Sequence, residues 1–295
     1  MLGRYGKIFA LGHRATVSLL DRDVIVEEKV DGSQISWGRV GEPPRLSIRS
    51  KRLELDPEEP PDLFAPSVRS ILRMHGDGLL PAGTVYRGEA VGRPRHNTLA
   101  YRRVPEGHIA LFDADTGVQA YVAYEEKQRI AAQLGIEAVP RLFEGRLTSK
   151  EQLEELLRTE SFLGGAAIEG VVIKRVAGSP LFGEDGLPVR AKYVSARFKE
   201  AHANNPDWKR TSQTEFLRAL ADSVSGPARW EKVVSGLRAE GLIAADSPVE
   251  IGRIIRHIRD DVRDECLDDI KYSLWEHFER RFLAAVTKEF PEWYK

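Results

Sequence analysis

The sequence predicts an α+β fold, in which an antiparallel-rich region of strands and helices is followed by a small all-α domain. Two observations indicate this class. Between residue 24 and about residue 176, short β-branched or alternating runs are separated by turn residues. From about residue 204 onward, apolar residues recur at helical spacing instead. Because 295 residues exceed what one core usually organises, we expect two domains, 1–203 and 204–295.

The strand region begins with three short runs and ends with two more. They span residues 24–26, 34–37, 45–48, 171–173 and 189–194. An Asp-Gly pair at 31–32 and two prolines at 43–44 divide the first three. Runs this short, joined by tight turns, favour antiparallel pairing, because parallel strands need long crossover connections.

Helices are predicted where the periodicity changes. Within the first region they span residues 66–74, 124–134 and 151–157. The first two close on Gly76 and Gly135, and Thr148 with Glu151 forms a predicted capping box for the third. After the predicted junction at Asn204, Asn205 and Pro206, helical stretches span residues 217–220, 230–237, 249–262 and 267–282. We expect Trp275, Phe278 and Phe282 to form part of a helical core.

Composition excludes several classes of protein. Apolar residues make up 42% of the chain and charged residues 30%, which is typical of a globular protein and not of a disordered one. The net charge of -1 gives no field that would draw the whole molecule to a polyanion, so any phosphate site must be local. The single cysteine, Cys266, excludes an internal disulfide and suits a reducing compartment. No apolar stretch reaches membrane-spanning length, so we expect a cytoplasmic protein without a membrane partner.

The main chemical motif is Glu28-Lys29-Val30-Asp31-Gly32, a lysine at the exit of an apolar strand followed by an acidic turn. Alone, a Lys-x-Asp-Gly sequence is equally typical of a surface hairpin. Further charged or aromatic motifs follow successive strands. They are Tyr86-Arg87-Gly88-Glu89, Phe112-Asp113, Glu169-Gly170 and the run from Val189 to Tyr193 that contains Lys192.

In this order, the motifs resemble those of the lysine (covalent) nucleotidyltransferase superfamily, which comprises ATP-dependent DNA ligases, RNA ligases and mRNA capping enzymes. The resemblance covers roughly residues 7–199. It is strongest to the RNA ligase 2-like branch, through Glu-Lys-Val-Asp-Gly-Ser, the segment from His96 to Tyr101, and the helical tail. DNA ligases and capping enzymes usually carry an OB-fold there. The resemblance implies an antiparallel-rich nucleotidyltransferase (ATP-grasp-like ligase) domain over residues 1–203.

The resemblance also implies a mechanism. Lys29 would attack the α-phosphorus of ATP, expel pyrophosphate and hold AMP covalently. An ordinary lysine has a pKa near ~10.4, so only about one in a thousand is neutral near pH 7.4. Lys192, Arg190 and a metal ion are expected to lower the pKa of Lys29. The metal, Mg²⁺ or Mn²⁺, would be held by Glu169 and Glu89.

The family pattern assigns the other roles residue by residue. Lys29, Lys192 and Lys174 are the predicted catalytic residues, and Phe112 and Val172 would cover the two faces of adenine. The implied nucleotide contacts are Glu28, Lys29, Asp31, Arg49, Glu89, Phe112, Glu169, Val172, Lys174, Arg190 and Lys192. The sequence departs from the branch at Arg190, where lysine is frequent. Lys51 and Arg52 remain alternatives to Arg49.

The predicted RNA contacts form a basic, Gly/Pro/Asn-containing loop, a mixture suited to phosphate contact and base stacking. They are Arg93, Arg95, His96, Tyr101, Arg102 and Arg103, and a solvated loop is the alternative interpretation. The sequence therefore predicts an ATP-dependent RNA ligase acting on RNA ends or a nicked duplex. Two alternatives stay open: a DNA ligase or capping guanylyltransferase, and a non-catalytic nucleotide-binding regulatory protein.

Overall fold

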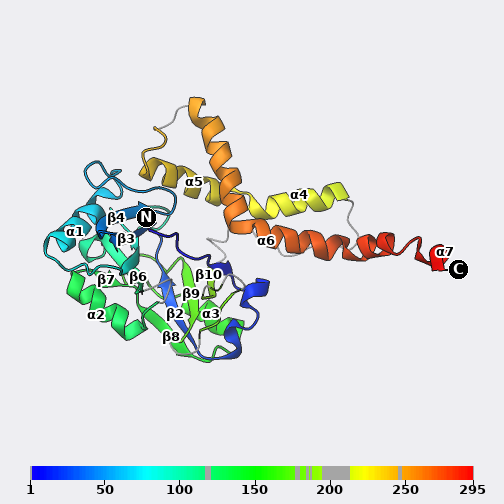
Figure 1. The fold of residues 1–295 in the computed structure, drawn as a ribbon, viewed down its shortest axis with the longest axis horizontal. Helices are drawn as coiled ribbons and strands as arrows, with labels where there is room; N and C mark the ends of the chain where they lie inside the picture. Colours follow the sequence, from blue (N-terminus) through cyan, green and yellow to red (C-terminus); the bar gives the residue numbers. More distant parts are fainter. Residues whose placement is uncertain are drawn as a thin grey trace. The chain divides into compact units, whose positions relative to one another are not determined.

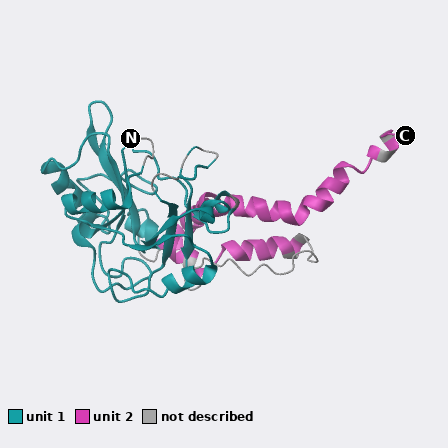
Figure 2. Ribbon diagram, turned by 90° about the horizontal axis from the view of Figure 1, so that it is seen from below, with its two compact units in different colours: residues 1–198, 235–244 teal, residues 199–234, 245–295 magenta. Residues whose placement is uncertain are grey.

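The computed structural model describes residues 2–116, 121–176, 180–183, 186, 188–194, 213–244 and 248–294 (Figure 1). Two mainly antiparallel sheets with flanking helices precede a helical region, which confirms the α+β class. The chain divides into two compact units (Figure 2). The first comprises residues 1–198 with 235–244, and the second comprises 199–234 with 245–295. The predicted boundary at 203/204, with its Asn204–Pro206 junction, lies outside the described residues.

The first sheet has the strand order β1-β10-β9-β2-β8. Its strands are β1 (Phe9–Ala10), β2 (Val24–Lys29), β8 (Arg141–Gly145), β9 (Gly170–Arg175) and β10 (Arg190–Val194). Among the described strands of this sheet, the short pairing of β1 with β10 alone is parallel. The predicted runs at 24–26, 171–173 and 189–194 thus lie in one sheet, although about 140 residues separate the first from the second.

The second sheet has the strand order β4-β3-β5-β6-β7. Its strands are β3 (Ser33–Val40), β4 (Arg45–Ser50), β5 (Val85–Ala90), β6 (Ile109–Asp115) and β7 (Glu137–Ala138). The predicted strands 34–37 and 45–48 are confirmed as β3 and β4, which pair antiparallel. Because β2 leads directly into β3 through residues 30–32, the lysine motif lies at the crossing from one sheet to the other.

Each sheet has its own hydrophobic core. Helices α1 (Ala65–Gly76) and α2 (Tyr124–Leu134) contribute to the core of the second sheet, and α3 (Lys150–Leu156) contributes to that of the first. Helix α1 buries residues spaced three apart, Val68, Ile71 and Met74, as an amphipathic helix should. Short 3-10 turns η1 (Arg14–Thr16), η2 (Leu19–Asp21) and η3 (Glu106–His108) complete the first unit as described.

The second unit is helical, as predicted. Its elements are α4 (Gln213–Val224), the start of α5 (Pro227–Ala239), η5 (Pro248–Glu250), α6 (Ile251–Val286) and α7 (Phe290–Tyr294). The stretches 249–262 and 267–282 join into the single helix α6, because no glycine or proline lies between them to end it. Cys266 is buried in this unit, as an apolar residue would be.

Two local predictions are wrong. The capping box of α3 uses Ser149 and Gln152, one residue later than predicted, because Ser149 has the extended backbone conformation that a cap requires. The predicted aromatic core of α6 is wrong for Trp275 and Phe282, which are each about half exposed, whereas Phe278 packs edge-on against the buried Phe216. Among the described residues, no helix is long and apolar enough to span a membrane.

We expect Ile71→Ala to destabilise the first unit by about 2–5 kcal/mol, because it empties a fully buried site in the core of the second sheet. The neighbouring Leu72, 38% exposed on the same helix, provides the matched control. Leu72→Ala should cost less than about 1 kcal/mol. Urea unfolding of both variants measures the difference, and equal losses would contradict the assignment of this core.

Candidate functional site

One face of the first sheet carries four of the predicted site residues. The register of β9 with β10 sets Lys192 opposite Val172, and Arg190 opposite Lys174. The residues that alternate with them are buried in the core beneath α3. Because successive side chains of a strand point to opposite faces, these four side chains share the face that is turned away from that core.

Strand β2 adds Lys29 to the same face. Val24 and Val26 point into the core beneath α3, so Glu27 and Lys29 lie on the opposite side, and Lys29 pairs with Gly170. The Lys29 Nζ lies 2.6 Å from Oε2 of Glu169, the residue that immediately precedes β9. Both side chains keep partial exposure, 26% and 15%. The pair is therefore sheltered yet accessible from solvent.

The turn after Lys29 is clamped by the segment that runs from His96 to Tyr101. One Asp31 carboxylate oxygen accepts hydrogen bonds from the backbone amides of Thr98 and Leu99, at 2.8 and 2.7 Å. The Tyr101 hydroxyl accepts one from the Asp31 amide at 2.7 Å. Asp31, predicted to organise the turn that presents Lys29, thus ties that turn to a loop about 70 residues later in the chain.

Two further side chains of the same loop hold the next residues of the turn. The Asn97 side chain donates to the Gly32 carbonyl at 2.7 Å, and the His96 ring lies 2.9 Å from the Ser33 hydroxyl. Burial lowers the pKa of His96 to about 4, so its ring is neutral at neutral pH. His96 and Tyr101 are only 3% and 5% exposed. Both predicted RNA contacts thus face the turn, and neither ring is open for a base to stack on.

The glycine of the motif is required by close packing against β5. A Cβ atom at Gly32 would lie 2.7 Å from the Ala90 carbonyl oxygen and 3.2 Å from the Glu89 Cβ. No side chain fits at that distance from backbone. The close approach brings Glu89, a predicted metal and nucleotide contact, next to the turn that follows Lys29.

A β-bulge presents Phe112 and Asp113 together. Strand β6 pairs Leu111 with Gly88 and Asp113 with Arg87, which leaves Phe112 as the extra residue. The extra residue shifts the alternation of the strand. Leu111 faces the core of the second sheet before the bulge, and Ala114 faces the same core after it. Asp113 consequently points away from that core, toward Lys174.

Asp113 organises the ends of β9 and β10. Its Oδ1 lies 2.7 Å from the Lys174 Nζ, and its Oδ2 lies 3.6 Å from the Arg190 Nε. Burial alone would raise the pKa of Asp113, but these two cations hold it below the ordinary value. Tyr5 donates a hydrogen bond to the same carboxylate, and its ring packs edge-on against Phe112. Sequence reasoning missed Tyr5, which has no motif around it.

A second buried pair extends this network. The Lys127 Nζ, from α2, lies 2.5 Å from Oε1 of Glu27, whose other oxygen lies 2.8 Å from Lys174. Burial lowers the pKa of Lys127 to about 8, although Glu27 opposes the shift. Glu27 and Lys127 are each 2% exposed. Neither was predicted, because each resembles an ordinary surface residue until the 100-residue contact is known.

Two predicted nucleotide contacts are already engaged by the protein. Glu28 accepts hydrogen bonds from the Ser161 hydroxyl at 2.5 Å and the Phe162 amide at 3.1 Å, and burial raises its pKa. Arg49 donates from Nη1 to the Leu2 carbonyl at 2.8 Å. Contact of either residue with a nucleotide stays a prediction.

The remaining predicted RNA contacts are four exposed arginines. Arg102 lies 3.7 Å from Glu160, and Arg103 makes two hydrogen bonds to Glu137, at 2.6 and 2.8 Å. Exposed ion pairs of this kind contribute little to stability.

Among the described residues, a magnesium or manganese ion could be held only by a small number of protein ligands. No cluster of three or more His, Cys, Asp or Glu residues that could hold a metal occurs within the described ranges. Mg²⁺ usually retains waters and is held by one or two carboxylates together with substrate phosphates. Glu169 and Glu89 are the predicted members of such a smaller set, and metal binding by either residue stays a prediction.

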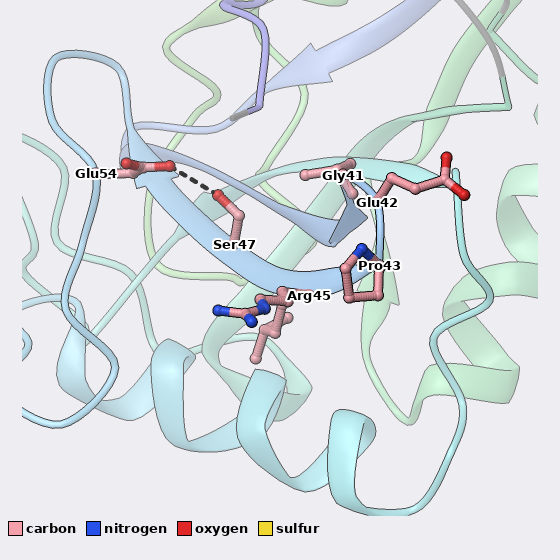
Figure 3. A pocket seen from close by; sticks show the side chains of 8 residues that line it. Gly41, Glu42, Pro43, Arg45, Ser47 and Glu54 are labelled. Carbon is pink, nitrogen blue, oxygen red and sulfur yellow. Dashed lines mark hydrogen bonds between the residues drawn. The ribbon is translucent and has the colours of Figure 1, made fainter.

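A shallow pocket of about 320 Å³ lies elsewhere, along the β3–β4 hairpin (Figure 3). Ser47 donates a hydrogen bond to Glu54 at 2.9 Å beside it. None of the predicted site residues lines this pocket, so we assign it no role.

The buried His96, in the loop that holds the turn after Lys29, leads us to expect that stability depends on pH. Since the pKa of His96 falls from 6.5 to about 4 on folding, the unfolded chain binds the proton first as the pH decreases. Stability should therefore fall between pH 6.5 and 4, by up to about 3 kcal/mol more than in His96→Gln, which cannot titrate. Urea unfolding across this range measures the difference. Parallel curves for the two proteins would contradict a buried neutral His96.

Comparison with known proteins identifies the family. The family model for RNA ligase matches residues 22–194, which is more than half of the chain. Naegleria gruberi RNA ligase with PPi is a similar solved structure, with a TM-score of 0.47 and 18% identity over 68% of this chain and 57% of that one. A mutant of the same ligase with ATP and Mn has a TM-score of 0.49 and 18% identity, over 67% and 57%.

The chain spans 57% of the length of these solved structures. No curated protein matches it. The length of the family match decides the assignment: the chain belongs to the RNA ligase family.

Proposed function

We propose that this chain is an ATP-dependent RNA ligase, which joins 5′-phosphate and 3′-hydroxyl ends through AMP carried on Lys29. The supporting observation is that Lys29 shares one face of the first sheet with Lys174 and Lys192, with Glu169 beside its amine. A nucleophile on a sheet face that also carries cations suits attack on a polyphosphate. Residues 1–203 would be the adenylyltransferase domain and 204–295 a helical region, with residues 235–244 completing the first unit.

Three displacements complete the reaction. The unprotonated Lys29 Nζ attacks the α-phosphorus of ATP, an N–P bond forms, and the P–O bond to pyrophosphate breaks. An oxygen of the RNA 5′-phosphate then attacks the same phosphorus, which breaks the N–P bond and restores the lysine. Finally the 3′-hydroxyl attacks the 5′-phosphorus, loses its proton, and AMP departs. The ion pair with Glu169 must open before the first step, since Nζ needs its lone pair.

The protein's own groups position the nucleotide. Phe112 and Val172 would cover the two faces of adenine, and Lys174 and Lys192 would bind phosphate. The further proposed contacts are Glu28, Asp31, Arg49, Glu89, Glu169 and Arg190. A divalent cation held by Glu169 and Glu89 would neutralise phosphate charge when bound. Asp31, with the loop that clamps it, keeps the Lys29 turn in one orientation.

RNA binding is proposed for the exposed arginines Arg93, Arg95, Arg102 and Arg103, because their guanidinium groups suit phosphate oxygens. His96 and Tyr101 would act in support, through the turn that they hold. The substrates would be RNA ends or a nicked duplex. We propose a cytoplasmic location, because a chain with one cysteine suits a reducing compartment.

Incubation with ATP labelled at the α-phosphate, followed by a denaturing gel, tests the first step. Wild-type protein should become labelled, and Lys29→Ala should reduce labelling by at least about 1,000-fold, because the nucleophile is lost. Lys150→Ala, at an exposed lysine of α3, is the matched control and should label normally. Sealing of a nicked RNA duplex then tests the complete reaction.

The alternatives give different results in the same assays. Labelling from GTP instead of ATP would indicate a capping guanylyltransferase, and sealing of DNA alone would indicate a DNA ligase. If no label is transferred after any AMP already bound has been removed, the proposed adenylylation activity is contradicted, and a nucleotide-binding regulatory protein is favoured.

A further inference from the structure

The two chain neighbours of Lys29 point into the protein. Glu28 is 3% exposed and Val30 is 2% exposed, and Val30 belongs to a hydrophobic cluster that also contains Tyr101. The Lys29 side chain, by contrast, keeps 26% of its surface exposed. Because successive side chains of an extended backbone point to opposite sides, the direction of Lys29 depends on how Glu28 and Val30 are held.

The Glu28 carboxylate is held by two donors from one short loop, residues 159–168, which connects α3 to β9. The Ser161 hydroxyl donates to Oε1 at 2.5 Å, and the Phe162 amide donates to Oε2 at 3.1 Å. Each carboxylate oxygen thus accepts one hydrogen bond, the pattern that suits the ionised form. The loop therefore holds the residue that immediately precedes the nucleophile.

The Ser161 hydroxyl has a fixed direction. It donates its proton to Glu28 and accepts a hydrogen bond from the Leu163 amide at 3.2 Å, and Ser161 is only 4% exposed. Its backbone is also engaged, because its amide donates to the Ala166 carbonyl at 2.9 Å and its carbonyl accepts from the Gly164 amide at 2.7 Å. The hydrogen-bonded loop therefore aims the hydroxyl at the Glu28 carboxylate.

The same loop leads directly to Glu169. The Ile168 amide donates to the Thr159 carbonyl at 3.1 Å, which closes the loop one residue before Glu169. The carboxylate of Glu169 lies 2.6 Å from the Lys29 Nζ. One loop thus contacts the residue before the nucleophile and carries, at its end, the residue that pairs with the nucleophile's amine.

This loop is also bonded to the loop that holds Asp31. The Arg102 amide donates to the carbonyl oxygens of Leu163 and Gly164, at 3.2 and 2.9 Å. Lys29 is consequently held on both sides in the chain, by one loop through the residue before it and by the other through the turn after it.

We propose that Ser161 is a positioning residue for the nucleophile: by holding the Glu28 carboxylate, it fixes the backbone at Lys29 and so the direction in which Nζ meets the α-phosphorus. The reaction named here rests on the proposed function. A buried carboxylate that loses one of its two donors is left partly unsatisfied, so the end of β2 would shift or loosen. A displacement of about 1 Å in a reacting group can slow a reaction about 100-fold.

Amide hydrogen exchange of the full chain, followed by mass spectrometry, tests the positioning without any reaction. Ser161→Ala should speed exchange in a peptide covering residues 28–33 by about tenfold, because one charge-assisted hydrogen bond is lost. Ser67→Ala is the matched control, since Ser67 is also buried and donates to the His108 carbonyl at 2.8 Å. It should leave that peptide within about twofold of wild type, and unchanged exchange in Ser161→Ala would overturn the proposal.

Single-turnover labelling with ATP tests the effect on the reaction. Ser161→Ala should lower the rate constant at saturating ATP about tenfold or more and keep the KM for ATP within about twofold, because the nucleotide contacts remain. Ser161→Cys, whose thiol is a weaker donor, should fall between Ser161→Ala and wild type. Ser67→Ala should react at the wild-type rate.

The outcomes separate positioning from folding and from the proposed function. A variant that merely unfolds would lower the fraction of protein labelled and leave the rate constant unchanged, and that result for Ser161→Ala would overturn the positioning role. Wild-type protein that takes up no label would contradict the proposed function, whereas the exchange measurement would still decide whether Ser161 holds the end of β2.

Discussion

The pairing of β9 with both β2 and β10 is the constraint on which the site depends. Side chains alternate along each strand, so the register decides which charges share a face. With Lys29 opposite Gly170 and Lys192 opposite Val172, the cations gather on the side turned away from the core beneath α3. A slip of one residue in β10 would bury Arg190 and Lys192 in that core and turn its apolar residues outward.

Buried charge gives the site its order. Lys174 contacts Glu27 and Asp113, which come from different sheets, and burial would lower its pKa if these acids did not raise it. Such a pair is weak evidence for stability, because desolvation offsets most of the attraction. Its effect is geometric. Glu27 and Asp113 can each satisfy their partners in few orientations, so these contacts fix the position of the first sheet relative to the second at the site.

Local sequence patterns predict the secondary structure and the lysine motif, but not the contacts between residues far apart in the chain. Periodicity and turn residues sufficed for the strands at 24–26 and 171–173 and for α2, whose predicted bounds coincide with the observed ones. The Lys-x-Asp-Gly motif is local and was recognised. The pairs of Glu27 with Lys127 and of Tyr5 with Asp113 join residues at least 100 positions apart, and nothing near them in the chain distinguishes them from surface groups. The inward orientation of Tyr101 likewise depends on a contact with Asp31, 70 residues away.

The return of residues 235–244 to the first unit affects how the protein is made. Ala239 belongs to the core of the second sheet, and Glu240 accepts a hydrogen bond from the buried Ser50 at 3.0 Å. A ribosome delivers residues in order, at about 5–20 per second. All strands of both sheets have therefore been synthesised some tens of residues before Ala239, the last residue of this core, leaves the ribosome. During that interval the core of the second sheet is incomplete in the nascent chain. It is completed only when residues 235–244, at the start of the helical region, have been synthesised.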